Sequence, residues 1–304
     1  MNNSKHIQLH GLTDVGCTRT ENEDCFMIQL VGDPRGSLNP TQVFDVQEDR
    51  DVFMAVSDGM GGAAAGEVAS RTALTTLGEV LADREQLLRN ASPEEIVKIL
   101  EKGLQEANGA IIRKAQEIQS RRGMGATVTA LYLKGDVMYL FQIGDSRAYV
   151  LRDGRLNRIT RDQSFVGHLV EMGTITESQA MRHPQRNVIL QALGTQEELK
   201  VDVSFLPLCK GDLVIVCSDG LYTEFPPETL TRKVQDLADK DFTVILQTLV
   251  QEAKQAGGKD NITVIGLAVK DGMPRREPGE EPRYRPFPFL DQDDPLRKAQ
   301  SIFQ

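Results

Sequence analysis

The sequence predicts an α+β protein in which strands and helices occur in groups and do not alternate. Two helical patterns follow one another between residues 66 and 118, and short apolar runs separated by tight turns then extend from 126 to 151. Helical periodicity returns from about 228 to 256, after two further apolar runs. Grouped strands and paired helices favour packed α+β layers over an alternating βαβ arrangement.

In the first half of the chain, each predicted element has a local signal. The run 52–56 is short, apolar and rich in β-branched and aromatic residues, which indicates a buried strand. Residues 66–90 then show apolar positions at helical spacing. The next helix has a clear start, because Ser92 suits the N-cap, Pro93 suits the first helical position and Glu95 completes a capping box.

The second half of the chain is predicted to combine strands with a long surface excursion. Strands are expected at 126–133, 137–143, 148–151, 201–205, 213–217 and 262–269. Tight turns join the first three, which predicts an antiparallel meander. Residues 163–195 have few long apolar runs and are expected to cross the surface. Residues 1–270 therefore form the compact domain, and the Pro-rich, charged stretch 271–304 is expected to be a disordered tail.

The overall composition is that of a soluble globular protein, with 304 residues of which 40% are hydrophobic and 26% are charged. A net charge of -9 argues against binding to nucleic acid or to an anionic membrane surface. The N-terminus lacks the apolar core of a signal peptide, and no apolar run is long enough to span a bilayer, so a cytoplasmic location is expected. Four cysteines without a CxxC pair indicate reduced thiols, and the absence of an obvious sticky helix favours a monomer.

Acidic residues stand at several places where the chain is predicted to turn. Asp58 and Asp219 each follow an apolar run and precede Gly, which indicates a strand that stops at a turn. Glu23 and Asp24, near the N-terminus, and Asp260, just before the last apolar run, join them. Carboxylates that converge must bind protons or cations. Since no His or Cys stands in these motifs, the all-oxygen ligand set favours Mg²⁺ or Mn²⁺ over zinc.

Five short motifs follow one another along the chain. They are Arg19 with Glu23-Asp24, Asp58-Gly59, Gly144-Asp145-Ser146-Arg147, Ser218-Asp219-Gly220 and Asp260-Asn261. Singly, each aspartate could be an ordinary turn former. Together and in this order, the motifs resemble those of the metal-dependent protein phosphatase family, the type 2C serine/threonine phosphatases, in its compact bacterial form. The resemblance covers almost the whole chain to Lys270.

The resemblance implies a four-layer α/β/β/α sandwich, in which two antiparallel sheets pack face to face and a helix pair covers each outer face. It also implies a centre for two Mn²⁺ or Mg²⁺ ions at one end of the sandwich. Asp58 would bridge the two ions, the Gly59 carbonyl would bind the second, and Asp219 with Asp260 would complete the first. Asp145 with Asp219 would form a third, weaker site.

The resemblance further implies a reaction without a covalent phosphoenzyme. Glu23 and Asp24 would hold metal-bound waters or support the ligands, and Arg19 would bind the substrate phosphate through two parallel hydrogen bonds. Two cations about 3.5–4 Å apart lower the pKa of a shared water, so the bridging hydroxide would attack phosphorus in line. The expected substrates are phosphoserine and phosphothreonine in proteins, and the family's habits imply a serine/threonine protein kinase and its substrates as partners.

Three positions depart from the family's pattern of histidines. Many relatives have His where this chain has Met60, and bacterial relatives commonly have His where it has Ala63. The family's usual Asp-His-Ser, at the start of a surface flap that here spans residues 163–195, contains Gln163 in place of His. The group that protonates the leaving alkoxide is therefore unassigned. The insertion from Gly32 to Arg50 is longer than a hairpin needs and could shape a partner surface.

Two other functions fit parts of this pattern. A non-catalytic phosphatase-like scaffold could bind a kinase or another partner, but such scaffolds usually lack metal ligands, and the ligands are all present here. The same fold and metals could also serve another phosphoester, such as phosphotyrosine or a small metabolite, because the motifs recognise only phosphate. Substrate choice would then depend on the flap, residues 163–195, and on the insertion. A P-loop is disfavoured, since residues 59–66 lack its Lys and its spacing.

Overall fold

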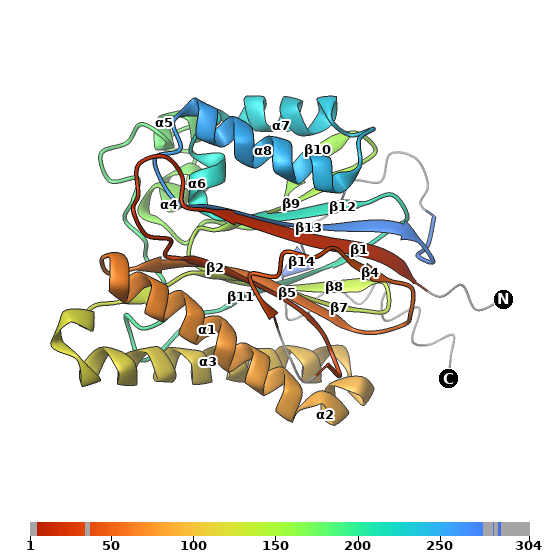
Figure 1. Ribbon diagram of the computed structural model, residues 1–304, viewed down its shortest axis with the longest axis horizontal. Coiled ribbons are helices and arrows are strands. Elements are labelled where there is room, and N and C mark those ends of the chain that lie inside the picture. The colour runs from red at the N-terminus through yellow and green to blue at the C-terminus, as the bar shows by residue number, and fades with distance from the viewer. Residues whose placement is uncertain (1–4, 34–36, 276–281, 283–284, 287–304) are drawn as a thin grey trace.

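The computed structural model describes residues 5–33, 37–275, 282 and 285–286, and these form four layers (Figure 1). Two antiparallel sheets lie face to face in the middle, and helices cover the outer face of each sheet. The predicted α+β class and the α/β/β/α sandwich that the family resemblance implies are both confirmed.

Both sheets are built from antiparallel neighbours that are mostly distant in the sequence. The larger sheet has the order β14 (Arg285–Pro286), β11 (Asp202–Pro207), β8 (Val137–Ile143), β7 (Val128–Lys134), β5 (Val52–Met60), β2 (Asp24–Leu30) and β3 (Ser37–Leu38), and β6 (Gly125–Ala126) pairs with β5. The smaller sheet has the order β10 (Arg155–Arg158), β9 (Arg147–Arg152), β12 (Leu213–Cys217), β13 (Ile262–Asp271), β1 (His6–Asp14) and β4 (Phe44–Val46). Each sheet therefore combines strands from the first and the second half of the chain.

The helices fall into three groups according to the surface they cover. The larger sheet is covered by α1 (Ala63–Asp83), α2 (Glu85–Asn90) and α3 (Pro93–Glu117), followed by the 3₁₀ turn η1 (Gln119–Arg121). The smaller sheet is covered by α6 (Asp219–Tyr222), α7 (Pro227–Asp236) and α8 (Phe242–Ala256). The surface excursion contains α4 (Phe165–Glu171) and α5 (Glu177–Ala180). A flap therefore stands apart from the two helix layers.

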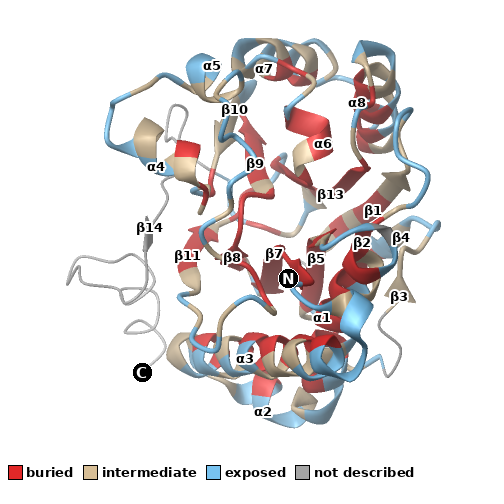
Figure 2. Ribbon diagram, turned by 90° about the vertical axis from the view of Figure 1, so that its left-hand side faces the viewer, coloured by how far each residue is buried: buried red, intermediate tan, exposed pale blue. Residues whose placement is uncertain are grey.

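Among the described residues, the core consists of three apolar clusters, one between each two adjacent layers. The central cluster joins the two sheets through side chains such as Phe26, Met54 and Val214. The outer clusters join α1 and α3 to the larger sheet and α8 to the smaller one. Figure 2 shows this as buried strands in the middle and helices whose outward faces are exposed. Strands buried on both faces explain why their sequences read as continuous apolar runs.

The predicted helix start at Ser92 is confirmed in atomic detail. Ser92 Oγ accepts a hydrogen bond from the Glu95 backbone N–H at 3.3 Å, and Glu95 Oε2 accepts one from the Ser92 N–H at 2.8 Å. Pro93 occupies the first helical position, where a missing N–H costs nothing. Such a cap contributes about 1 kcal/mol and fixes where α3 begins.

Two expectations about strands need correction. The strand that was expected to end at Val56 continues to Met60, because β5 gains pairing with β6 through Gly59 and Met60. The predicted antiparallel meander is confirmed for β7 and β8 but is wrong at the next turn, since β8 and β9 belong to different sheets and the chain crosses between them at 144–146. Local turn signals do not tell a hairpin from a crossing of this kind.

The insertion from Gly32 to Arg50 supplies the edge strands β3 and β4, one for each sheet. In the expected tail, β14 pairs with β11, and most other residues of the tail lie outside the described residues. None of the helices that the structure describes is both long enough and apolar enough to cross a bilayer.

Candidate active site

The structure brings five of the predicted acidic residues to one end of the sandwich. Asp24 begins β2 and lies directly opposite Asp58 in β5. Asp145 lies in the segment that crosses between the sheets, Asp219 begins α6, and Asp260 precedes β13. This end faces left in Figure 1 and faces the viewer in Figure 2. Both sheets thus contribute carboxylates to a single site.

Two motif glycines are required because backbones approach each other closely at this end. A Cβ atom at Gly59 would lie 2.1 Å from the Gly66 carbonyl oxygen and 2.8 Å from that of Glu23. A Cβ atom at Gly220 would lie 2.1 Å from the carbonyl oxygen of Asn261. These glycines set the spacing between the segments that carry carboxylates, so their role differs from that of turn formers.

Replacing Gly220 with Ala is therefore expected to push α6 away from the start of β13. Overpacking of this kind costs about 1–3 kcal/mol, which corresponds to a fall of about 5 °C in melting temperature. The affinity of the predicted cation site for Mn²⁺ should fall as well, because Asp219 moves with the helix. Differential scanning fluorimetry and calorimetric Mn²⁺ titration measure the two effects. The matched control is Gly109→Ala in α3, where the new Cβ meets only the Arg113 side chain and the melting temperature should rise or stay unchanged.

A hydrogen-bond network connects the three segments that carry Glu23 and Asp24, Asp219, and Asp260. Ser218 Oγ donates to Asp24 Oδ2 at 2.6 Å and accepts from the Thr263 backbone N–H at 3.0 Å. Asn261 Oδ1 accepts from the Glu23 backbone N–H at 2.8 Å. The sequence alone indicated no role for Ser218, Asn261 or Thr263, although the first two each stand beside an aspartate in one of the five motifs. Each of them fixes a neighbouring segment in place.

Arg19 lies at the rim of the acidic cluster. Its Nη2 donates to Asp260 Oδ2 at 2.8 Å, and its Nη1 lies 3.7 Å from Glu23 Oε2. The side chain is 47% exposed, so part of the guanidinium faces solvent. The neighbouring carboxylates raise its pKa, chiefly through the bond to Asp260. Arg19 is therefore a fixed positive charge whose outer face is open to an incoming anion.

Four carboxyl groups of the cluster, those of Asp24, Asp58, Asp145 and Asp219, have pKa values above that of an ordinary aspartate. Burial, followed by repulsion between the carboxylates, raises the pKa of Asp145 to about 8 and that of Asp219 to about 6. Burial also raises the pKa of Asp24 to about 8, against the lowering effect of its hydrogen bond from Ser218. The pKa of Asp58 rises well above 3.8 for the same reasons, with Asp24 as its strongest neighbour. Ionised together at neutral pH, these groups need compensating positive charge.

The residues present fit divalent cations. Glu23 Oε1 is buried beside Gly66 and has no well-aligned hydrogen-bond partner among the described residues, a position that a bound ligand would stabilise. Within the described residues, no three His, Cys, Asp or Glu side chains already form a compact metal-binding group. Instead, Asp219 lies within hydrogen-bonding reach of Asp58, and Arg19 donates a hydrogen bond to Asp260. In this state, protons and Arg19 neutralise the carboxylate oxygens of the cluster. Carboxylate oxygens are also the ligands that Mg²⁺ and Mn²⁺ prefer, so either cation could replace the protons.

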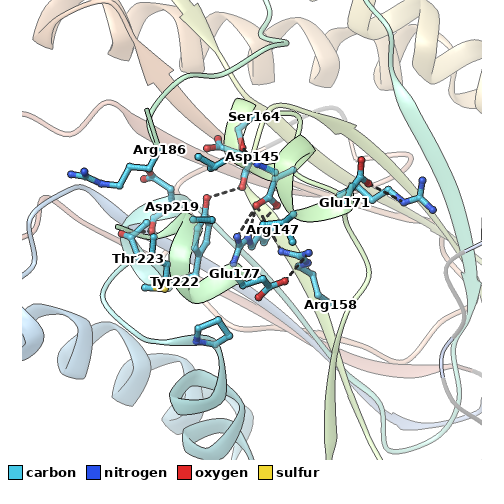
Figure 3. A pocket seen from close by; sticks show the side chains of 18 of the residues that line it. Asp145, Arg147, Arg158, Ser164, Glu171, Glu177, Arg186, Asp219, Tyr222 and Thr223 are labelled. Atoms are coloured by element: carbon cyan, nitrogen blue, oxygen red, sulfur yellow. Dashed lines mark hydrogen bonds and ion pairs between the residues drawn. The ribbon is translucent and has the colours of Figure 1, made fainter. Parts of the chain in front are cut away.

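Beside the cluster, Asp145 and Asp219 line a cavity of about 60 Å³ that the flap closes on the other side (Figure 3). Gln163, which replaces the family's histidine, connects the base of the flap to Gly144 through two hydrogen bonds. Its Oε1 accepts from the Gly144 N–H at 2.9 Å, and its backbone N–H donates to the Gly144 carbonyl at 2.9 Å. Gln163 therefore makes backbone contacts that hold the segment carrying Asp145.

Comparisons with known proteins identify the family of the chain. The family model described as protein phosphatase 2C matches residues 40–266. The chain is 35% identical to the serine/threonine phosphatase Stp of Listeria welshimeri over 222 residues, which cover 72% of this chain and 84% of that protein. It is 32% identical to the protein phosphatase PhpP of Streptococcus pneumoniae over 267 residues, which cover 87% of this chain and 98% of that protein.

A solved structure extends the similarity to the fold. The catalytic domain of the serine/threonine protein phosphatase PstP, in complex with two manganese ions, matches with a TM-score of 0.69 and 29% identity. The match covers 88% of this chain and 99% of the PstP chain. The family model spans well over half of the present sequence. The chain therefore belongs to the protein phosphatase 2C family, whose members are metal-dependent, in its compact bacterial form.

Proposed function

We propose that this enzyme removes phosphate from phosphoserine and phosphothreonine in proteins, using two Mn²⁺ or Mg²⁺ ions. The observation that carries the proposal is the group of buried and half-buried carboxylates that both sheets bring to one end of the sandwich, next to an exposed arginine. Desolvation and mutual repulsion raise the pKa of four of them, Asp24, Asp58, Asp145 and Asp219. Such a group holds cations in an all-oxygen site, and the cations and the arginine can together bind a phosphate dianion.

The proposal assigns each candidate ligand to one or more of the ions. Asp58 would bridge the two ions, the Gly59 carbonyl would bind one of them, and Asp219 with Asp260 would bind the other. Asp145 would join Asp219 in holding a third ion. Bound in this way, the ions supply Lewis acidity and lower the pKa of a coordinated water towards neutrality.

The protein's own groups then position the substrate. Arg19 has an exposed guanidinium face, so it can donate two parallel hydrogen bonds to phosphate oxygens while Asp260 keeps the group in place. Glu23 lies close to Arg19 and, with the buried Asp24, would hold waters or orient ligands at the floor of the site. No histidine lines the cavity beside the site among the residues that the structure describes, so the proposal assigns no histidine as acid.

The test of this function is hydrolysis of a phosphothreonine peptide and of p-nitrophenyl phosphate with Mn²⁺ and with EDTA. Metal-dependent turnover of the peptide supports the proposal. A folded protein that binds Mn²⁺ but hydrolyses neither compound would instead favour the phosphatase-like scaffold. Hydrolysis of the small ester without the peptide would favour a small-molecule phosphoester as substrate.

The contribution of Arg19 can be separated from that of the cations. Arg19→Lys retains a positive charge but loses the planar pair of donors, so the KM for the phosphopeptide should rise about tenfold with a smaller effect on kcat. Steady-state kinetics at saturating Mn²⁺ measures this change. Arg113→Lys on the outer surface of α3 is the matched control and should leave both constants unchanged. Equal constants for Arg19→Lys and the wild type would remove Arg19 from substrate binding.

We also propose that the enzyme acts as a cytoplasmic monomer on the products of a serine/threonine protein kinase. The support is the net charge of -9, which disfavours nucleic acid and anionic membranes as partners, and the chemistry of the substrate, which a kinase must supply. Light scattering of the purified protein and fractionation of cells that express it test the first two points. Rapid dephosphorylation of a kinase's products tests the third.

A further inference from the structure

A buried ion pair joins the base of the flap to the metal-binding end of the sandwich. Arg147 begins β9, and its Nε lies 3.1 Å from both carboxylate oxygens of Asp162, while its Nη2 lies 2.6 Å from Asp162 Oδ2. The two side chains are 15% and 6% exposed. Asp162 directly precedes the flap, so this two-pronged pair anchors the flap to the smaller sheet.

Arg147 also contacts the elements that carry two of the proposed ligands. Its guanidinium carbon lies 3.7 Å from the centre of the Tyr222 ring in α6, the helix that Asp219 begins. The Tyr222 hydroxyl donates to the Asp145 carbonyl at 3.0 Å, and Figure 3 shows this bond beside the Arg147 side chain. One guanidinium therefore packs against α6 and, through Tyr222, against the segment that carries Asp145.

The flap side of the pair extends further. Asp162 also lies 3.8 Å from Arg158 Nη1, and Arg158 Nη2 lies 2.9 Å from Glu177 Oε1 in α5. These contacts form a continuous chain of charged groups from α5 to the metal-binding end. Arg147, Arg158 and Glu177 all line the cavity between the flap and the site.

We infer that the Arg147–Asp162 pair is a positioning device that links the flap to cation binding at Asp145 and Asp219. Breaking the pair would loosen the base of the flap and, on the other side, the segment of Asp145 and the helix of Asp219. A bound cation that fixes those ligands would in turn hold the flap, because coupling between two sites is reciprocal. This inference rests on the proposed function, since it requires the site to bind cations.

The same strand provides a matched control. Arg152 ends β9 and forms a similar two-pronged pair with Asp212, in which Nε donates to Asp212 Oδ1 at 2.7 Å. Both side chains are almost fully buried, at 3% and 2% exposure. This pair joins β9 to the start of β12, at the far end of the sandwich from the acidic cluster. Breaking it should cost stability without touching the flap or the carboxylates.

The experiment compares Asp162→Asn with Asp212→Asn in the full chain. Titration calorimetry with Mn²⁺ alone measures cation binding. Limited proteolysis with trypsin, with and without Mn²⁺, measures opening of the flap through the rate of cleavage after the exposed Arg182 and Arg186. Asp162→Asn should weaken Mn²⁺ binding about tenfold at the weakest site, within the range typical of coupled sites. It should also remove the protection from trypsin that Mn²⁺ gives the wild type, and raise KM for the phosphopeptide more than for p-nitrophenyl phosphate.

Asp212→Asn should lower the melting temperature but leave Mn²⁺ binding, cleavage and both KM values unchanged. If Asp162→Asn does not fold, Arg147→Lys and its control Arg152→Lys replace the pair of variants, because Lys keeps the charge but lacks the second donor. If the test and control variants bind Mn²⁺ equally and are cleaved equally, the inference is wrong but the proposed function still stands. A wild type that neither binds Mn²⁺ nor hydrolyses phosphopeptide overturns the proposed function together with it.

Discussion

Replacing Asp58 with Asn is expected to lower kcat/KM for a phosphothreonine peptide by about a thousandfold or more. Asp58 stands at the centre of the cluster, where Asp24, Asp145, Asp219 and Asp260 all act on its pKa. An amide has the same shape but carries no charge, so it would not hold the two cations that the proposal places at Asp58. Cations at such sites contribute several kcal/mol to stabilising the transition state, and each 1.4 kcal/mol corresponds to a factor of ten.

The measurement is steady-state kinetics at increasing Mn²⁺, together with calorimetric Mn²⁺ titration of the same variant. The binding of at least one ion should be lost, so that excess Mn²⁺ does not restore activity. Asp153→Asn is the matched control. Asp153 is an exposed residue in the turn between β9 and β10 with φ of 49°, a conformation that Asn accepts readily. Wild-type activity in Asp58→Asn would contradict its place in the metal centre.

Without divalent cations, the protein is expected to become less stable as the pH rises from about 4 to 8. Burial and mutual repulsion raise the folded-state pKa of Asp24 and Asp145 to about 8 and that of Asp219 to about 6, above the ordinary 3.8. The folded state therefore binds more protons than the unfolded state in this window, and its stability falls with increasing pH. One pKa unit corresponds to about 1.4 kcal/mol, so the melting temperature should fall by about 5 °C or more between pH 5 and pH 8.

Melting curves in EDTA and in Mn²⁺ at both pH values check this expectation. Mn²⁺ should reverse the loss at pH 8, because a ligand that binds only the folded state stabilises it. Asp58→Asn should flatten the pH dependence in EDTA, since it removes one of the repelling charges. If wild type and variant lose equal stability between pH 5 and pH 8, other titrating groups are responsible.

Short local signals were sufficient to predict much of the fold. The capping box at Ser92 and Glu95 specified the start of α3 because its hydrogen bonds lie within four residues. The apolar runs 137–143 and 213–217 correspond to β8 and β12 residue for residue, because strands buried on both faces need continuous apolar sequence.

Long-range pairing decided what local signals could not. The segment 144–146 looks like a hairpin turn, yet it crosses between sheets because β9 pairs with β12 and β8 pairs with β11. Likewise, β5 extends beyond Val56 because β6 pairs with its last two residues.

For the site, residue types predict which kind of ligand can bind, whereas the packing of distant segments sets how those residues are arranged. The acidic residues and the absence of His or Cys among them were sufficient to predict an oxygen-ligand centre for Mn²⁺ or Mg²⁺, because ligand preference follows from residue type. Only the fold places Asp24 opposite Asp58 and forms the Arg147–Asp162 pair beside them. Those contacts join residues far apart in the chain, and their geometry depends on the register and packing of both sheets.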